Sequence, residues 1–187
     1  MRLIVGISGT SGVIYGIRLL EELRKNRDVE IHLILTKAAE TIIREETGLS
    51  KENVEALATH HYEIDCLTAP IASGSFRTDG MIVIPCSTKT LSGIAYGYSD
   101  NLLLRAADVT LKENRHLILV PRETPLSPIH LRNMLELSRI GVTILPAMPA
   151  FYHKPRTIDD MVNFVVGRAL DILRIEHSLY QRWGMSL

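Results

Sequence analysis

The chain has 187 residues, 46% of them hydrophobic, and its 21 basic and 21 acidic side chains balance to a net charge of zero. This length predicts a single domain, residues 1–187, large enough to bury about 70% of its unfolded surface. The charge balance argues against a protein that binds nucleic acid or an anionic membrane, and no apolar run approaches the ~18 residues of a membrane span.

The two cysteines, Cys66 and Cys86, are too few for a disulfide framework and indicate a reducing, cytoplasmic setting. No Cys/His spacing resembles a metal site, and the pair His60-His61 lies in a polar stretch. We therefore expect no metal.

The first predicted unit is a strand, a glycine-rich turn and a helix. Residues 3–7 are an apolar, partly β-branched run, residues 8–12 read Ser-Gly-Thr-Ser-Gly, and residues 13–25 carry apolar side chains at helical spacing. Glycines allow close backbone approach, and a helix start offers free N–H groups at the positive end of its dipole. This junction favours an anion, although a tight turn without a ligand stays an alternative.

The turn matches neither of the two standard phosphate-binding motifs. It lacks G-x-x-x-x-G-K-S/T, and its glycines miss the spacing G-x-G-x-x-G. The next strand, residues 30–35, ends in Thr36-Lys37, where a dinucleotide-binding protein often places an acid for the ribose. A hydroxyl and a cation suit phosphate better, so we predict a mononucleotide-type phosphate site.

Further strands and helices alternate along the chain. Helices are predicted over residues 38–47 and 51–58, residues 59–79 are mostly loop, and residues 81–84 form a third strand followed by a hydroxyl-rich helix start. A helix over 101–112, a strand over 117–120, a helix capped by Ser127 and closed by Gly141, and a strand over 142–145 come next. A proline-rich loop over 146–155 precedes a last amphipathic helix that Thr157 caps.

This alternation predicts an α/β fold with a parallel sheet that helices cover on both faces. Ligands of such folds bind at the carboxyl ends of the strands. Four polar strand ends, at residues 8–12, 36–37, 87–90 and 122–123, therefore fall along one rim.

Charged residues on the helices and loops admit two interpretations. Arg105, Asp108 and Lys112 share one helix face, either as a solvated salt-bridge face or as cations that hold a phosphate. Arg122 and Glu123 follow a strand end, where a guanidinium can fork onto phosphate oxygens and a carboxylate could move a proton.

Four other residues carry weaker signals. Glu46 lies near a helix end, where the helix dipole disfavours an acid, and Arg168 flanks an apolar helix stripe. Tyr152 either offers its hydroxyl to a ligand or packs, and Trp183 is suited to an interface.

With these residues assembled, the chain resembles the UbiX-like flavin prenyltransferases, a family that also includes proteins described as phenolic-acid decarboxylase components, over essentially its whole length. The resemblance rests on residues 8–12, 73–76 (Ser-Gly-Ser-Phe), 85–91 (Pro-Cys-Ser-Thr-Lys-Thr-Leu), 105–109, 111–113, 120–123, 149–152 and the closing Arg-Trp at 182–183. It implies a Rossmann-like, flavodoxin-like subunit in a homododecamer with sites shared between neighbouring subunits.

The resemblance also implies a reaction. Reduced FMN would accept a dimethylallyl group from dimethylallyl monophosphate at N5 and C6, without a metal, and the prenylated FMN would serve a UbiD-like decarboxylase. The residues that would hold FMN are Gly9, Thr10, Ser11, Thr36, Ser87, Thr88, Lys89, Thr90 and Arg122. The residues that would hold the prenyl phosphate are Tyr152 and Arg168, with charge from Lys112 and Arg105. Glu123 would act as acid and base, and Ser11 and Glu46 would assist ring closure.

Two alternatives remain beside this enzyme. The first is an FMN carrier or subunit that assists an aromatic-acid decarboxylase without chemistry of its own. The second is a flavin-dependent decarboxylase; the cysteine decarboxylases of this fold resemble a P-x-M-N pattern, whereas residues 146–149 here read Pro-Ala-Met-Pro. The sequence does not identify the pathway served.

Overall fold

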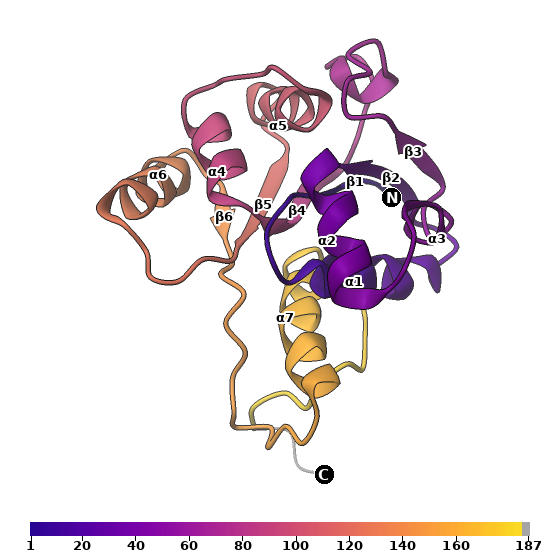
Figure 1. Cartoon of the computed structure of the whole chain (residues 1–187), viewed down its shortest axis with the longest axis vertical. Helices are drawn as coiled ribbons and strands as arrows, with labels where there is room; N and C mark the ends of the chain where they lie inside the picture. The colour runs from indigo at the N-terminus through magenta and orange to yellow at the C-terminus, as the bar shows by residue number, and fades with distance from the viewer. Residues whose placement is uncertain (185–187) are drawn as a thin grey trace.

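The computed structural model describes residues 1–184 and contains one parallel sheet in the strand order β3-β2-β1-β4-β5-β6 (Figure 1). The strands are β1 (Arg2–Ile7), β2 (Glu30–Leu35), β3 (His60–Tyr62), β4 (Gly80–Cys86), β5 (His116–Pro121) and β6 (Thr143–Ile144). The chain order reverses between β1 and β4, which makes their carboxyl ends the switch point of the sheet.

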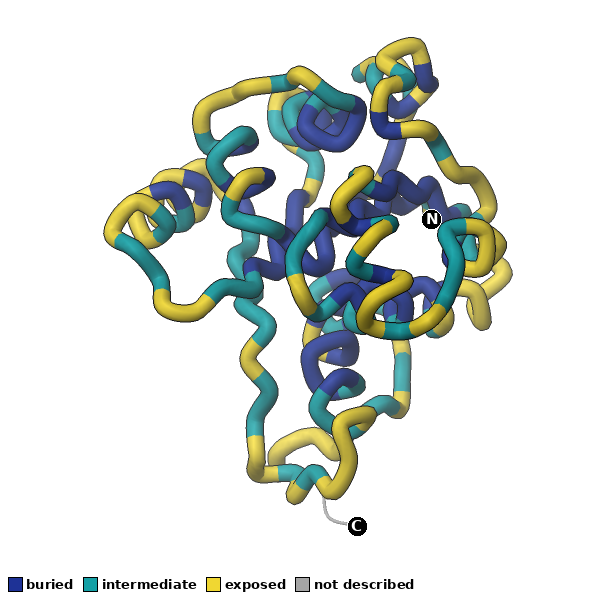
Figure 2. The backbone as a smooth tube through the Cα atoms, in the orientation of Figure 1, coloured by how far each residue is buried: buried dark blue, intermediate teal, exposed yellow. Residues whose placement is uncertain are grey.

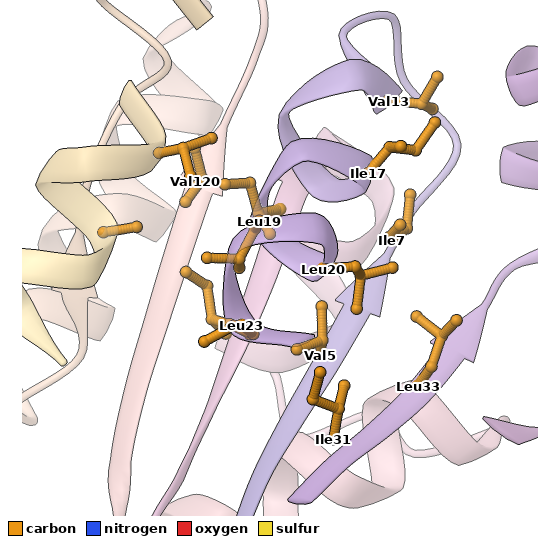
Figure 3. Close-up of a cluster of buried hydrophobic side chains, with 14 of the residues drawn as sticks. Val5, Ile7, Val13, Ile17, Leu19, Leu20, Leu23, Ile31, Leu33 and Val120 are labelled. Carbon is orange, nitrogen blue, oxygen red and sulfur yellow. The ribbon is translucent and has the colours of Figure 1, made fainter. Parts of the chain in front are cut away.

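Helices cover the sheet on both faces, as the alternation of elements predicts. One apolar cluster joins one face of the sheet to α1 (Val13–Arg24), α2 (Lys37–Thr47) and α7 (Ile158–Ile172) (Figure 3). The other joins the opposite face to α4 (Thr88–Ala95), α5 (Leu102–Lys112) and α6 (Pro128–Arg139). The central strand β4 is buried throughout, and its neighbour β1 is buried except at its first residue, because both faces of the sheet are covered (Figure 2).

Local sequence signals fix the helix starts. Ser127 and Thr157 accept hydrogen bonds from the third residues of α6 and α7, and Ser50 does the same for the short helix α3 (Lys51–Glu55). The caps at Ser127 and Thr157 were predicted from the hydroxyl residue that precedes each helix, and both are confirmed.

Two predicted boundaries are wrong, and one short strand was missed. Residues 59–79 are mostly loop, as predicted, but they also contain β3 and a 3₁₀ turn, η1 (Pro70–Ala72). The strand β3 lacks an apolar pattern because it has only three residues and lies at the edge of the sheet. Its extended conformation depends on pairing with β2 rather than on its own sequence. The helix predicted over 51–58 ends at Glu55, and the strand predicted over 142–145 is limited to Thr143–Ile144.

The last helix, α7, does not follow directly on the carboxyl end of a strand. After β6 the chain runs away from the sheet and returns as α7, which packs against α1 (Figure 1). Within residues 1–184, no helix is both long enough and apolar enough to cross a membrane.

Candidate functional site

The loops that follow β1 and β4 are tied together at the switch point. The fully buried Ser8 hydroxyl donates to the carbonyl oxygen of Pro85 at 2.9 Å and accepts from the backbone N–H of Ser87 at 2.7 Å. The N–H of Ser8 donates to the same Pro85 carbonyl at 3.2 Å. These contacts fix the two loops in one relative position, because a buried polar group strongly favours the geometry that satisfies it.

A pocket of about 760 Å³ opens beside these loops, within the range of small-molecule sites. Its lining includes most residues that the resemblance assigns to FMN: Gly9, Thr10, Thr36, Ser87, Thr88, Lys89 and Thr90. Glu123, the predicted acid and base, also lines it. The predicted rim is therefore a single concave site.

The strongest anion-binding feature of the pocket is the start of α4. The Ser87 hydroxyl caps this helix, accepting from the N–H of Thr90 at 3.2 Å and donating to the Thr90 hydroxyl at 3.1 Å. Thr88 and Lys89 are the first two helical residues, so their N–H groups have no partner inside the helix. Both residues line the pocket, and the positive helix end and the exposed lysine complement a phosphate there.

The start of α1, where the sequence predicts an anion, holds a carboxylate of the chain itself. Glu46 Oε2 accepts from the N–H of Gly12 at 2.9 Å and from the N–H of Val13 at 3.3 Å. This contact explains an acid near the C-terminus of α2, because the positive end of α1 offsets the unfavourable dipole of α2. The Glu46 carboxylate thus occupies the position at the start of α1 that a ligand phosphate would take.

Arg122 and Ser11 flank the pocket rather than line it. The backbone oxygen of Arg122 accepts from the Thr10 hydroxyl at 3.1 Å, which ties the end of β5 to the first loop. Burial raises the pKa of Tyr15, and the nearby Arg122 guanidinium opposes part of that rise. Among the described residues no carboxylate forms an ion pair with Arg122, so its charge is available to a ligand.

Glu123 is held at the pocket wall by a local contact. Its Oε1 accepts from the N–H of Thr124 at 2.9 Å. The second carboxylate oxygen remains for a group in the pocket, which is the arrangement that a proton-transfer role requires.

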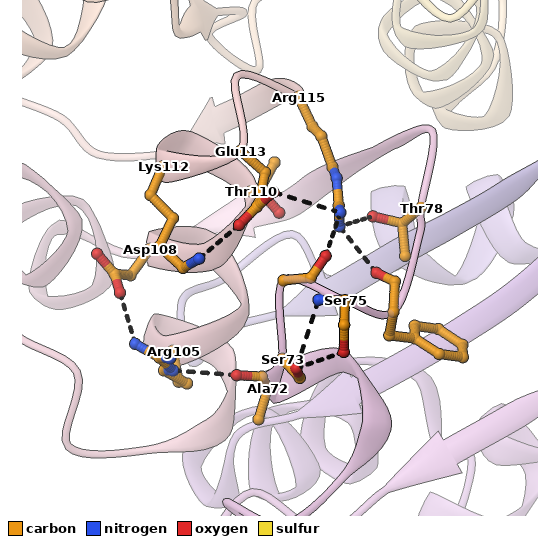
Figure 4. Close-up of polar contacts among 12 residues, drawn as sticks. Ala72, Ser73, Ser75, Thr78, Arg105, Asp108, Thr110, Lys112, Glu113 and Arg115 are labelled. Atoms are coloured by element: carbon orange, nitrogen blue, oxygen red, sulfur yellow. Dashed lines mark hydrogen bonds and ion pairs between the residues drawn. The ribbon is translucent and has the colours of Figure 1, made fainter.

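The predicted prenyl-phosphate residues on α5 do not line this pocket. Arg105 forms an ion pair with Asp108 at 2.8 Å and donates to the carbonyl oxygen of Ala72 at 3.1 Å (Figure 4). Lys112 pairs with its neighbour Glu113 beside Gly74, where an added Cβ would meet both side chains. Both cations of this helix face are thus paired with carboxylates of the same chain, and neither lines the pocket.

Tyr152 and Arg168 lie in a third place, around α7. The Arg168 guanidinium pairs with Asp171 at 3.0 Å. Tyr152 packs edge-on against Phe164 and Trp183, with ring centroids 5.8 Å and 5.3 Å apart. One chain therefore distributes the predicted site residues over the rim pocket, the α5 face and the α7 region.

Several pocket residues were not predicted. They come from the segments 64–65 and 92–104 and are Ile64, Asp65, Ser92, Gly93, Tyr96, Tyr98, Asp100, Asn101 and Leu104. One sequence signal was present, because Asn101 is a capping residue and caps α5 by accepting from the N–H of Leu104 at 3.0 Å. The others lie in loops or on helix faces whose position only the tertiary fold determines.

Comparison with known proteins agrees with this geometry. The model of the flavoprotein family matches residues 1–170. A probable UbiX-like flavin prenyltransferase from Streptomyces sp. (strain D7) is 57% identical over 98% of this chain and 92% of its own length. The crystal structure of a dodecameric FMN-dependent UbiX-like decarboxylase from Escherichia coli O157:H7 superposes with a TM-score of 0.98 at 55% identity, covering 99% of this chain and 100% of that one. The structure of AnUbiX in complex with FMN and dimethylallyl pyrophosphate gives 0.96 at 48% identity, covering 100% and 98%.

Proposed function

The chain belongs to the flavoprotein family, among UbiX-like flavin prenyltransferases, and from that membership we propose that it prenylates reduced FMN. It transfers a dimethylallyl group from dimethylallyl monophosphate to N5 and C6 of the flavin. The observation that carries the proposal is the pocket at the switch point, lined by the hydroxyls and helix start that a flavin phosphate requires.

The residues of the pocket fit FMN. The free amides at the start of α4, the Lys89 ammonium and the unpaired Arg122 would hold its phosphate. Gly9 lies so close to Ala38 that an added Cβ would overlap the Ala38 Cβ. This close approach holds the first loop against α2, which leaves the pocket beside the loop open for a planar ring. When bound, reduced FMN supplies the nucleophilic positions N5 and C6.

The chain's own residues promote the departure of phosphate from the prenyl donor. The allylic C–O bond breaks with its electron pair leaving on the phosphate, so cations that stabilise this charge lower the barrier. We assign this role to Arg168, Lys112 and Arg105, with Tyr152 as a further hydrogen-bond donor. Glu123 exchanges a proton with the departing phosphate, and Ser11 and Glu46 act at ring closure.

Because these cations lie away from the pocket of their own chain, we propose that neighbouring subunits supply them. The dodecameric relative from E. coli supports this arrangement. Exposed apolar side chains of the kind that subunit interfaces bury lie on α6 and in the loop before α7: Ile129, Leu131, Leu135, Ile140, Met148 and Phe151. The prenylated product would then serve a UbiD-like decarboxylase.

The test is anaerobic incubation with reduced FMN and dimethylallyl monophosphate, followed by mass spectrometry of the flavin. We expect a flavin heavier by one five-carbon prenyl unit. Glu123→Gln should keep FMN bound but slow this gain, whereas Glu52→Gln, an exposed change on α3, should not.

Two outcomes would overturn parts of the proposal. Unmodified FMN retained by the assembled protein would favour a carrier or a flavin-dependent decarboxylase instead. A particle of only 21.0 kDa in light scattering would refute the shared site, since that is the mass of one chain.

A further inference from the structure

Three potential metal ligands meet at the edge of the sheet opposite the flavin pocket. Glu30 is the first residue of β2 and His60 the first of β3, so both lie at the amino ends of their strands. The register of these strands pairs His32 with His60. This parallel pairing brings together side chains that are far apart in the sequence, which is why no Cys/His spacing revealed them.

The donor atoms are spaced as ligands of one ion. Glu30 Oε1 lies 3.1 Å from His32 Nε2 and 3.2 Å from His60 Nε2. All three atoms lie within 4.8 Å of one another. Tetrahedral zinc, with ligand bonds of about 2.0–2.1 Å, places neighbouring donor atoms about 3.3 Å apart. The two carboxylate distances already match this spacing.

We propose that Glu30, His32 and His60 form a binding site for a divalent transition-metal ion of the Zn²⁺ type. Two imidazoles and one carboxylate are a recognised zinc ligand set that leaves the fourth position to water. Half of the His60 side chain is exposed, which gives an ion an entry path and gives this ligand freedom to close on it.

Neighbouring side chains orient His32 and Glu30 by contacts like those that orient the ligands of known metal sites. His32 is 1% exposed, and its Nδ1 lies 2.8 Å from the Tyr62 hydroxyl oxygen, which can accept a hydrogen bond from the Nδ1–H of an imidazole whose Nε2 holds a metal. Arg2 Nε donates to Glu30 Oε2 at 2.9 Å, and Oε1 faces the two imidazoles, hydrogen-bonded to His32 Nε2 at 3.1 Å, a contact that a bound ion would replace. The Phe76 ring stands edge-on to His32 at 5.3 Å and closes the inner side.

The ion would join β2 to β3 at the exposed edge of the sheet. The strand β3 has only three residues and pairs on one side with β2 alone. A bond from each strand to one ion would therefore raise the stability of the edge without taking part in prenyl transfer, because the flavin pocket is at the opposite ends of these strands.

The test compares two adjacent histidines in the full-length protein. After treatment with a chelator, the wild type, His60→Ala and His61→Ala are titrated with ZnCl₂ by calorimetry, and the Co²⁺ forms are compared by visible absorption. His61 is the matched control, since it is as exposed as His60 and lies 3.9 Å from Glu55 instead. Retained secondary structure and FMN binding verify that each variant is folded.

We expect the wild type and His61→Ala to bind one Zn²⁺ per chain with the same affinity and to show the absorption bands of tetrahedral Co²⁺. His60→Ala should bind at least about 10-fold more weakly, and Tyr62→Phe should lose about 10–100-fold, as expected for an outer-shell partner. Absence of Zn²⁺ binding by the wild type, or equal binding by His60→Ala, would overturn the proposal.

Discussion

Gly16, in the middle of α1, sets helix propensity against packing. Propensity alone predicts that Gly16→Ala stabilises the protein by about 1 kcal/mol. The structure predicts the opposite sign. A Cβ at this position would overlap the carbonyl oxygen of Ile84 and would lie 2.7 Å and 2.8 Å from side-chain carbons of Ile7.

The size of the stability loss depends on how far the atoms that meet the added Cβ can move. Overpacking a well-packed core costs about 1–3 kcal/mol, and the upper part of that range applies because one obstacle is the backbone of the central strand β4. After subtraction of the propensity gain, we expect a net loss of about 1–2 kcal/mol. For a chain of this size, this lowers Tm by about 2–8 °C.

The assay is thermal unfolding followed by circular dichroism, with Gly93→Ala as the comparison. An added Cβ at Gly93 meets only the end of the Leu104 side chain, at 2.9 Å and 3.0 Å, so a smaller loss is expected there. Ile7 and Ile84 lead directly into the two pocket loops, so Gly16→Ala should also weaken FMN binding. A Tm equal to or above that of the wild type would refute the reasoning.

Three further changes test the site and the α7 region. Glu46→Ala removes the acceptor for the first amides of α1 and should cost about 1 kcal/mol, seen in calorimetry as a Tm about 2–4 °C lower; an unchanged Tm would contradict the capping role. Cys86 is fully buried and burial raises its pKa, so a thiol reagent should modify only Cys66 in the folded protein and both thiols in denaturant; labelling of Cys86 in the native state would be the opposite result. Burial raises the pKa of Asp171, but the hydrogen bond from the Tyr180 hydroxyl and nearby cationic groups lower it further, below its usual 3.8. The stability from this carboxylate is present above that value and is lost as the pH falls through the lower folded value. Asp171→Asn should therefore lower Tm at pH 7 and match the wild type in acid, whereas a difference that does not change with pH would contradict this.

The sequence predicted most of the fold because the relevant signals are local. The buried strands are apolar runs, and the caps at Ser127 and Thr157 are hydroxyl residues directly before helices. The strand β3 was missed because its residues are polar and its pairing partner, β2, lies far along the chain. The same distance hid the grouping of His60 with Glu30 and His32.

The residues of the candidate site also fall into those that local sequence signals predict and those that only the tertiary fold brings together. Strand ends of a parallel sheet share one rim, so Thr36, Ser87 and Glu123 could be placed together from the sequence. From the local pattern, Glu46 was noted as an acid at an unfavourable helix end, and only the resemblance gave it a role in ring closure; its contact with the start of another helix was not foreseen. Tyr152 and Arg168 gave only weak local signals, and their assignment to the prenyl phosphate came from the resemblance, because no local pattern relates α7 to the pocket.

The starts of α1 and α4, both at the switch point, differ in how well they suit a phosphate. A phosphate placed at the start of α1 would face the Glu46 carboxylate, and two negative charges about 4 Å apart repel by about 4 kcal/mol near a protein surface. The start of α4 carries no such acid and has Lys89 beside it. Phosphate is therefore directed to α4. One helix start thus suits the flavin phosphate, and the amides of the other are already taken by a carboxylate of the chain itself.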